Sequence, residues 1–359
     1  MNKVNGVIAG AAVPHAPQFH SLPATEDADQ VERVRTAMQE AGEGLRALNP
    51  DVVIVMTNDH GDEFIVGPTP AFTVHCGNVA QGMHKHKGPW SLRGDIGYDV
   101  VRGLMQEGFD PAFTLDSMVP TAFTIPYEFM GYERDAPFLP LYINSYVPPQ
   151  PSAERCYAFG KAIDRVFARL GLRAVFIASG GLSHYPGTPQ YPNPDVTTDK
   201  IIYGEMAKGN LRHLLSYSDE ALDASGNVEA RAWIALAGAL GERKPDITAW
   251  EPSWHHTYAV FGWSQEARDT AIAPHYPPIP PEHVGLARAL FELRKSEAAC
   301  RQYLADGAGF ASNYGLTSAE TDALTAFDTD RLRDGFNIHA LLVAGAERRL
   351  EQLKSATHT

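Results

Sequence analysis

Three histidines each follow an apolar run typical of a buried strand. His15 ends "GVIAGAAVPH", His60 ends "DVVIVMTNDH" and His184 ends "RAVFIASGGLSH". Open α/β sheets bind ligands beyond the carboxyl ends of their strands, so three such loops can bring these histidines to one place. A single histidine after a strand is more often a surface or hydrogen-bonding residue, but three at equivalent positions predict a functional site.

Two histidines and one carboxylate form the facial triad of non-heme Fe(II) enzymes, which leaves adjacent positions open for substrate and O₂. Glu229 is the candidate carboxylate, in the first turn of the alanine-rich helix predicted within "ASGNVEARAWIALAGAL" (224–240). An acidic residue there also stabilises the helix dipole without further purpose. The same donor types form hydrolytic zinc sites, so a zinc-dependent hydrolase is an alternative.

The loop before His184 carries two glycines, Gly180 and Gly181. Glycine lets a backbone approach a ligand closely and adopts positive φ at no steric cost. Both properties are expected of this cramped loop.

The elements that must position these residues alternate between strand-like and helical patterns, which predicts an α/β fold with a mixed or parallel central sheet and flanking helices. Apolar runs predict strands, and segments of helical period predict helices. The strands are expected at 6–13, 51–58, 138–144, 173–179 and within 247–263, and the helices at 31–49, 96–108, 152–171 and 224–240.

Prolines crowd the segment 274–283, which is typical of a stiff linker. Only helical patterns follow it, and Thr317 with Glu320 forms a capping-box signal. We therefore predict a catalytic domain at 1–276 and a small all-α domain at 282–359.

Composition excludes several classes of function. The net charge of -13 disfavours nucleic acid and membrane surfaces as partners. The three cysteines show no C-x-x-C spacing, which favours a reducing compartment, and no apolar run is long enough to span a membrane. A cytoplasmic enzyme is the expectation.

Four motifs occur together in the first domain, namely "VPHAP" (13–17), "NDHGDEF" (58–64), "SGGLSHYPG" (179–187) and "SGNVEARAW" (225–233). With them the chain resembles the class III extradiol ring-cleavage dioxygenases, the superfamily of the catalytic β subunit of protocatechuate 4,5-dioxygenase. The segment "CRQYLADGAGFASNYGLTSAETDAL" (300–324) resembles the small α subunit of that enzyme, fused here as in the gallate dioxygenases.

The resemblance implies that His15, His60 and Glu229 bind Fe(II), and that His184 is a catalytic acid/base outside the metal's ligands. It implies insertion of both atoms of O₂ into a catechol-type ring, such as a protocatechuate- or gallate-like diol, to give a ring-opened semialdehyde or keto acid. A homodimer is also expected from the resemblance.

One departure from the family's sequence pattern concerns the substrate. Many relatives carry an Asp-His-Gly ahead of a T-x-P segment, and its histidine reaches toward the substrate; here Thr121 occupies the aligned position in "DSMVPTAFTIP" (116–126). Thr121 and Thr124 are therefore candidate substrate contacts, although a plain turn residue is the more usual role for each. A 2-aminophenol-type substrate becomes an alternative, as does a non-enzymatic relative.

Further histidines are weaker candidates. Strand alternation across "WHHTYAVFGW" predicts that only one of His255 and His256 faces the pocket, and His256 is the candidate substrate contact. The cluster "HKHK" at 84–87 is interpreted either as a patch for a substrate carboxylate or as a solvated loop. We expect no catalytic residue in the helical domain, where Tyr303, Tyr314 and His339 have packing or capping roles.

Overall fold

The computed structural model describes residues 5–64, 66–266 and 278–356. The chain divides into two compact units, Met1–Asp269 and Thr270–Thr359, and each is considered by itself. Of the predicted proline linker at 274–283, residues 274–277 lie outside the described residues. Every helix within the described ranges is too short or too polar to cross a membrane.

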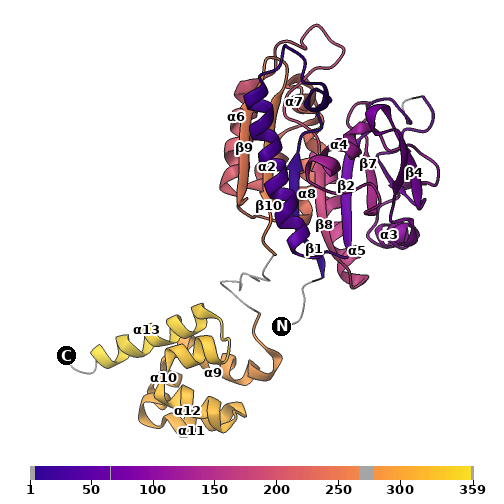
Figure 1. Ribbon diagram of the computed structural model, residues 1–359. Helices are drawn as coiled ribbons and strands as arrows, with labels where there is room; N and C mark the ends of the chain where they lie inside the picture. Colours follow the sequence, from indigo (N-terminus) through magenta and orange to yellow (C-terminus); the bar gives the residue numbers. More distant parts are fainter. Residues whose placement is uncertain (1–4, 65, 267–277, 357–359) are drawn as a thin grey trace. The chain divides into compact units, whose positions relative to one another are not determined.

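The first unit is built on an eight-stranded mixed sheet with the strand order β6-β3-β7-β2-β8-β1-β10-β9 (Figure 1). The four central strands, β7, β2, β8 and β1, are mutually parallel, and antiparallel pairings join β3 to β7 and β10 to β1. The prediction of a mixed sheet is therefore confirmed. The strands are β1 (Gly6–Val13), β2 (Val52–Asn58), β3 (Phe72–His75), β6 (Ala112–Thr114), β7 (Phe138–Ile143), β8 (Arg173–Ser179), β9 (Ile247–Pro252) and β10 (Thr257–Trp263).

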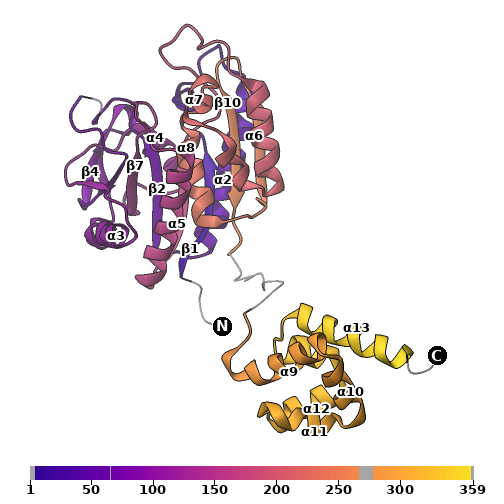
Figure 2. The same cartoon turned by 180° about the vertical axis from the view of Figure 1, so that it is seen from behind.

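Helices cover both faces of this sheet, which explains why its central strands are apolar along their whole length. One face packs against α3 (Gly94–Gln106), α5 (Ala153–Arg169), α6 (Val196–Lys208), α7 (Asp219–Ala224) and α8 (Ala230–Leu240). The other packs against α1 (Gln18–Ser21), α2 (Ala28–Ala47) and α4 (Thr121–Phe129). Figures 1 and 2 show the unit from opposite sides.

Two glycines let α5 and α8 approach backbone to backbone. A Cβ atom added to Gly160 would lie 1.7 Å from the carbonyl oxygen of Ala235, and one added to Gly238 would lie 2.0 Å from that of Tyr157. Nearly every residue of α8 is buried. The position of this helix, and of Glu229 directly before it, therefore depends on the two glycines.

The aromatic segment at 247–263 is two strands and not one. β9 and β10 pair antiparallel, and residues 253–256 form the connection between them. His255 and His256 thus lie outside any strand, so the alternation argument that placed only one of them toward the pocket is wrong.

Several elements went unpredicted from the sequence. A two-stranded sheet pairs β4 (Val79–Gly82) with β5 (Gly88–Ser91) around the short 3₁₀ helix η1 (His84–His86). Thr121 is the first residue of α4, and Thr124 lies within the same helix. The interpretation of both threonines as turn residues is therefore wrong. A second 3₁₀ helix, η2 (Leu211–Ser216), follows α6.

The second unit is helical around its own apolar core, to which Leu290, Tyr303 and Phe310 contribute. The capping box of Thr317 and Glu320 is confirmed, and the Tyr303 hydroxyl donates to the Leu324 carbonyl at 2.7 Å, a packing role. The elements are η3 (Pro281–His283), α9 (Val284–Lys295), α10 (Glu297–Ala305), α11 (Gly307–Ala311), η4 (Ser312–Tyr314), α12 (Ser318–Ala326), η5 (Arg331–Gly335) and α13 (Ala340–Ala356). Its identity as an α-subunit-like domain at 282–359 stays a prediction.

We predict that Gly160→Ala lowers the free energy of unfolding by about 1–3 kcal/mol, because the added methyl group overpacks the interface between α5 and α8. Gly204→Ala is the matched control, since Gly204 also lies in a helix but a Cβ there would meet no atom within 4 Å. This control should leave stability unchanged or raise it by up to about 1 kcal/mol. Urea denaturation measures both values, and equal losses in the two variants would contradict the packing argument.

Candidate active site

The three predicted histidines follow three neighbouring parallel strands. His15 follows β1, His60 follows β2, and His184 follows β8, which lies between them in the sheet. Because the strands are parallel, all three carboxyl ends reach the same edge. Glu229 joins them as the residue that directly precedes α8, and its side chain is fully buried.

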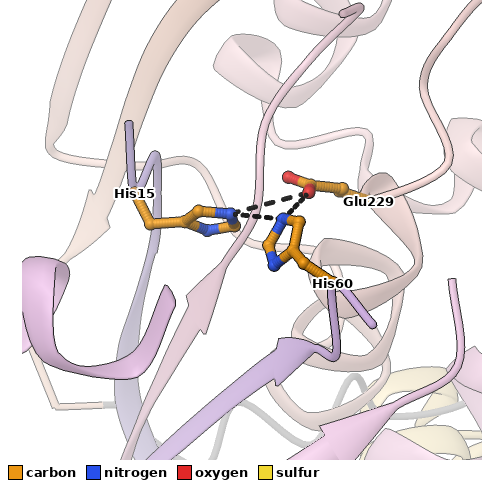
Figure 3. Close-up of side chains that lie close together, drawn as sticks. All are labelled: His15, His60 and Glu229. Carbon is orange, nitrogen blue, oxygen red and sulfur yellow. Dashed lines mark hydrogen bonds and ion pairs between the residues drawn. The ribbon is translucent and has the colours of Figure 1, made fainter. Parts of the chain in front are cut away.

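His15, His60 and Glu229 meet at the centre of this edge. His60 Nε2 lies 2.9 Å from Glu229 Oε1 and 3.3 Å from His15 Nε2, and His15 Nε2 lies 3.5 Å from the same oxygen. Figure 3 shows the three side chains pointing toward one another from two strand ends and a helix start. These residues form a group that could hold a metal ion.

The hydrogen bonds of His15 determine which of its ring nitrogens is free. Ser179 Oγ donates to the carbonyl oxygen of Ala122 at 2.6 Å, so it accepts from His15 Nδ1 at 2.9 Å. With the proton on Nδ1, the lone pair of His15 lies on Nε2, which faces Glu229. A hydrogen bond of this kind on the remote nitrogen is typical of histidine ligands in metal sites.

The Glu229 carboxylate is only half satisfied by the protein. Its Oε1 accepts hydrogen bonds from the Tyr146 hydroxyl at 2.9 Å and from Asn58 Nδ2 at 3.2 Å. Its Oε2 is buried without a hydrogen-bond partner. Although burial raises the pKa of this carboxyl, the neighbouring His15 and His184 outweigh that effect and hold its pKa well below the usual value.

These features fit a divalent metal. Ligand atoms bound at about 2.1 Å to one ion lie about 3.0–3.4 Å apart in octahedral or tetrahedral geometry. The distances among the three ligand atoms, 2.9, 3.3 and 3.5 Å, bracket that range. A cation would also satisfy the unpartnered carboxylate oxygen, which is otherwise costly to bury.

His184 lies beside this group with a different environment. Its Nδ1 donates to the Leu182 carbonyl at 2.9 Å, so the free lone pair is on Nε2, 3.2 Å from the Tyr146 hydroxyl. Burial lowers the pKa of His184, but the charge of Glu229, 3.5 Å away, and the hydrogen bond to Leu182 raise it overall. The ring can therefore accept and hold a proton at Nε2.

Buried Asp199 fixes the loop that carries His184. Its two carboxylate oxygens accept from the backbone nitrogen of Ser183 at 3.0 Å and from the Ser183 hydroxyl at 2.6 Å. Asn227 Nδ2 donates to the same carboxylate at 3.1 Å, which links this loop to the turn before Glu229.

Tyr146 is a site residue that the sequence analysis missed. Its buried hydroxyl donates to Glu229 and lies 3.2 Å from His184 Nε2, and burial, followed by the charge of Glu229, raises its pKa well above 10. It follows β7, the fourth central parallel strand, by three residues. The available signal was therefore its position after a strand end, the same one that singled out the histidines.

The glycines before His184 have one of the two predicted properties. A Cβ on Gly181 would lie 2.2 Å from His256 Nε2, and one on Gly180 would lie 2.8 Å from the Glu229 carbonyl oxygen. Neither residue has a positive φ, so that part of the prediction is wrong for this loop, whereas Gly61, which follows His60, does have a positive φ of 95°. Close packing alone explains why the loop is so cramped.

The other predicted contacts lie around the same centre. The His256 ring stacks on that of His184 with centroids 4.3 Å apart, and its buried Nε2 has no hydrogen-bond partner. His255 bonds Glu26 Oε1 at 3.1 Å. The "HKHK" interpretation needs correction, because His86 is buried while its neighbours are exposed, so the cluster is not one solvated patch.

A cavity of about 360 Å³ opens onto these residues. No lysine or arginine is present among the residues described as lining it. The lining consists of His15, Ala16, Pro17, Gln18, His60, Asp62, His84, Thr121, His184, Pro186, Tyr191, His255 and His256.

Fold and site together define a class, an α/β protein with a His/His/Glu group at the carboxyl edge of a mixed sheet. Residues 9–265 match the family model of the catalytic LigB subunit of aromatic ring-opening dioxygenase. The chain belongs to this family and is a ring-cleaving dioxygenase.

Several curated relatives carry the name 2,3-dihydroxyphenylpropionate/2,3-dihydroxicinnamic acid 1,2-dioxygenase. That of Burkholderia vietnamiensis is 30% identical over 232 residues, which cover 64% of this chain and 69% of the relative. That of Mycobacterium sp. (strain MCS) is 29% identical over 264 residues, covering 71% and 79%. That of Escherichia coli K12 is 31% identical over 175 residues, covering 48% and 55%, so the match spans about half of that protein.

We predict that Ser179→Ala weakens metal binding by about 10–100-fold, because it removes the group that fixes the His15 tautomer. Ser145→Ala is the matched control, since Ser145 is equally buried but its hydroxyl has no partner. Titration with Fe(II) under anaerobic conditions measures both dissociation constants. Unchanged affinity in the Ser179 variant would show that the tautomer is fixed in another way.

Proposed function

We propose that the chain is an Fe(II)-dependent extradiol dioxygenase in which His15, His60 and Glu229 hold the metal. The observation that carries the proposal is the convergence of two imidazole Nε2 atoms on a buried carboxylate with one unsatisfied oxygen. Bound Fe(II) would supply open positions for the ring hydroxyls and for O₂. The zinc-hydrolase alternative uses the same ligands, but membership of the dioxygenase family favours ring cleavage.

His184 is proposed as the acid/base. Its Nε2 lone pair lies beside the ligand group and its ring lines the cavity, so a substrate hydroxyl placed there can transfer its proton to Nε2. The Nδ1 bond to Leu182 keeps the ring in place, and the negative charge of Glu229 stabilises the imidazolium that forms. The same proton can then be returned to the opening ring.

Tyr146 is proposed to orient this pair. Its hydroxyl donates to Glu229 Oε1 and lies 3.2 Å from His184 Nε2, so it joins the carboxylate to the base. Its raised pKa keeps it protonated at neutral pH, which suits a hydrogen-bond donor and not a general base.

The proposed substrate is a catechol-type ring, either protocatechuate- or gallate-like or a related substituted diol. The relatives are named for substrates with a 2,3-dihydroxyphenyl ring, which supports the catechol-type ring. We propose Thr121 and His256 as substrate contacts, because both line the cavity and His256 Nε2 has no partner within the protein. A 2-aminophenol-type ring is the second candidate, since a buried histidine nitrogen can accept from an amino group.

We also propose a homodimer that acts in the cytoplasm. Its three cysteines are all free and buried, which suits a reducing compartment. Light scattering coupled to gel filtration measures the oligomeric state.

Oxygen uptake tests the proposed reaction. The Fe(II)-loaded protein is assayed with protocatechuate, gallate, 3-O-methylgallate, catechol, homoprotocatechuate and 2-aminophenol. We expect one O₂ consumed per ring and a yellow ring-opened product with at least one of them, and loss of uptake in Glu229→Gln, which keeps the side-chain volume but loses the charge. Uptake that survives in this variant would contradict the assignment of Glu229.

The lining of the cavity predicts a preference among ring substituents. Burying a carboxylate without a fixed cation is costly, and Asp62 in the lining adds repulsion. We therefore expect methyl gallate to be cleaved with a kcat/KM at least as high as that of gallate. A much higher kcat/KM for the acid would mean that a cation outside this lining recognises the carboxylate.

A further inference from the structure

A second group of potential metal ligands lies outside the site described above. It consists of His20 in α1, His86 in η1 and Glu128 in α4. These three elements are far apart in the sequence, and no step of the proposed reaction uses any of the three residues.

The side chains of the group are arranged around one carboxylate oxygen. Glu128 Oε2 is in contact with His86 Nε2 and lies 3.8 Å from His20 Nε2. The two imidazole rings are 4.7 Å apart and meet edge to face. One ligand atom from each residue lies within 4.8 Å of the other two.

Hydrogen bonds within the protein satisfy this group only in part, because His86 Nε2 is bonded to Glu128 Oε2 but His20 Nε2 has no partner. His20 Nε2 is buried without a hydrogen-bond partner, although the side chain as a whole is 19% exposed. Its distance of 3.8 Å to Glu128 is too long for a hydrogen bond. Two ligands of one tetrahedral zinc ion lie about 3.4 Å apart, so the gap is close to what a shared ion would bridge.

His86 is already oriented as a ligand would be. Its Nδ1 is bonded to Thr124 Oγ1, and its Nε2 is hydrogen-bonded to Glu128 Oε2. If a metal ion replaces the second of these bonds, Thr124 Oγ1 can accept from Nδ1 and leave the Nε2 lone pair for the ion. Glu128 is half exposed, which leaves room for a water molecule as a fourth ligand.

The nature of the donors selects the ion. Two imidazole nitrogens and one carboxylate suit zinc-type transition metals, whereas Mg²⁺ and Ca²⁺ prefer oxygen. The charges of Lys85, Arg35 and Arg134 act on these histidines and oppose a cation, which predicts a site of moderate affinity.

We propose that His20, His86 and Glu128 form a second metal site, one that binds a zinc-type divalent ion and holds together three segments of the cavity wall. Gln18 and His84 line the cavity and lie two residues from His20 and His86, and Thr121, which also lines it, is the first residue of the helix α4 that carries Glu128. Zinc binding here is independent of the chemistry proposed for His15, His60 and Glu229.

Zinc titration of the metal-free full chain tests the proposal, with bound metal measured by elemental analysis after dialysis. We expect two zinc ions per wild-type chain, because the His15, His60 and Glu229 group also accepts zinc. His20→Gln and Glu128→Gln should each lower the affinity for the second zinc ion by more than about tenfold. Tenfold is the smallest loss of metal affinity typical when a residue that only supports a ligand is replaced, and a ligand itself should matter more. Glu133→Gln, an exposed glutamate shortly after α4, is the matched control and should retain both ions.

The Glu229→Gln chain separates this proposal from the catalytic one. It should keep one zinc ion, and loading it with Co²⁺ should give the intense visible bands of a tetrahedral site, which Glu128→Gln in the same chain abolishes. Circular dichroism checks that each variant is folded. Wild-type zinc affinity in both His20→Gln and Glu128→Gln, or no second ion in the wild type, would overturn the proposal.

Discussion

The buried charge of Glu229 is the constraint on which the rest of the site depends. Moving a carboxylate out of water costs several kcal/mol unless opposite charge and hydrogen bonds replace the solvent. Here one carboxylate oxygen accepts hydrogen bonds from Tyr146 and Asn58, and the other has no hydrogen-bond partner among the described residues. The arrangement is therefore incomplete without a cation, and the imidazoles of His15 and His60 beside it are the groups that would share that cation.

The fold supplies this geometry through close packing. The neighbouring parallel strands β1, β8 and β2 place the three histidines at the edge formed by their carboxyl ends. Glu229 lies at the same edge because it directly precedes α8, in the helix layer beside the sheet. That layer is close because Gly160 and Gly238 allow backbone contact, and Gly181 leaves space for the stacked rings of His184 and His256. Glycines far apart in the chain thus act together on the position of one carboxylate.

Much of this could be predicted from the sequence because its signals are local. An apolar run followed by a histidine marks a strand end, and parallel topology brings such ends together, so His15, His60 and His184 were accessible to reasoning. Glu229 depended on a resemblance, since an acidic residue at a helix start has an ordinary alternative meaning. Tyr146 also follows a strand end but was missed. The role of Ser179 and the burial of His86 were not accessible, because they depend on which distant segments meet, as when Ser179 accepts from His15 and donates to Ala122. The alternation argument for His255 and His256 also failed, because both residues lie in the turn between β9 and β10 and not in a strand.

Anomalous diffraction at the iron edge, from crystals of the chain soaked anaerobically in Fe(II), tests the central claim most directly. The account predicts one dominant peak within bonding distance, about 2.0–2.3 Å, of His15 Nε2, His60 Nε2 and a Glu229 carboxylate oxygen. His184 should lie nearby but outside bonding distance. A dominant peak elsewhere, or iron bound by His184 in place of Glu229, would contradict it.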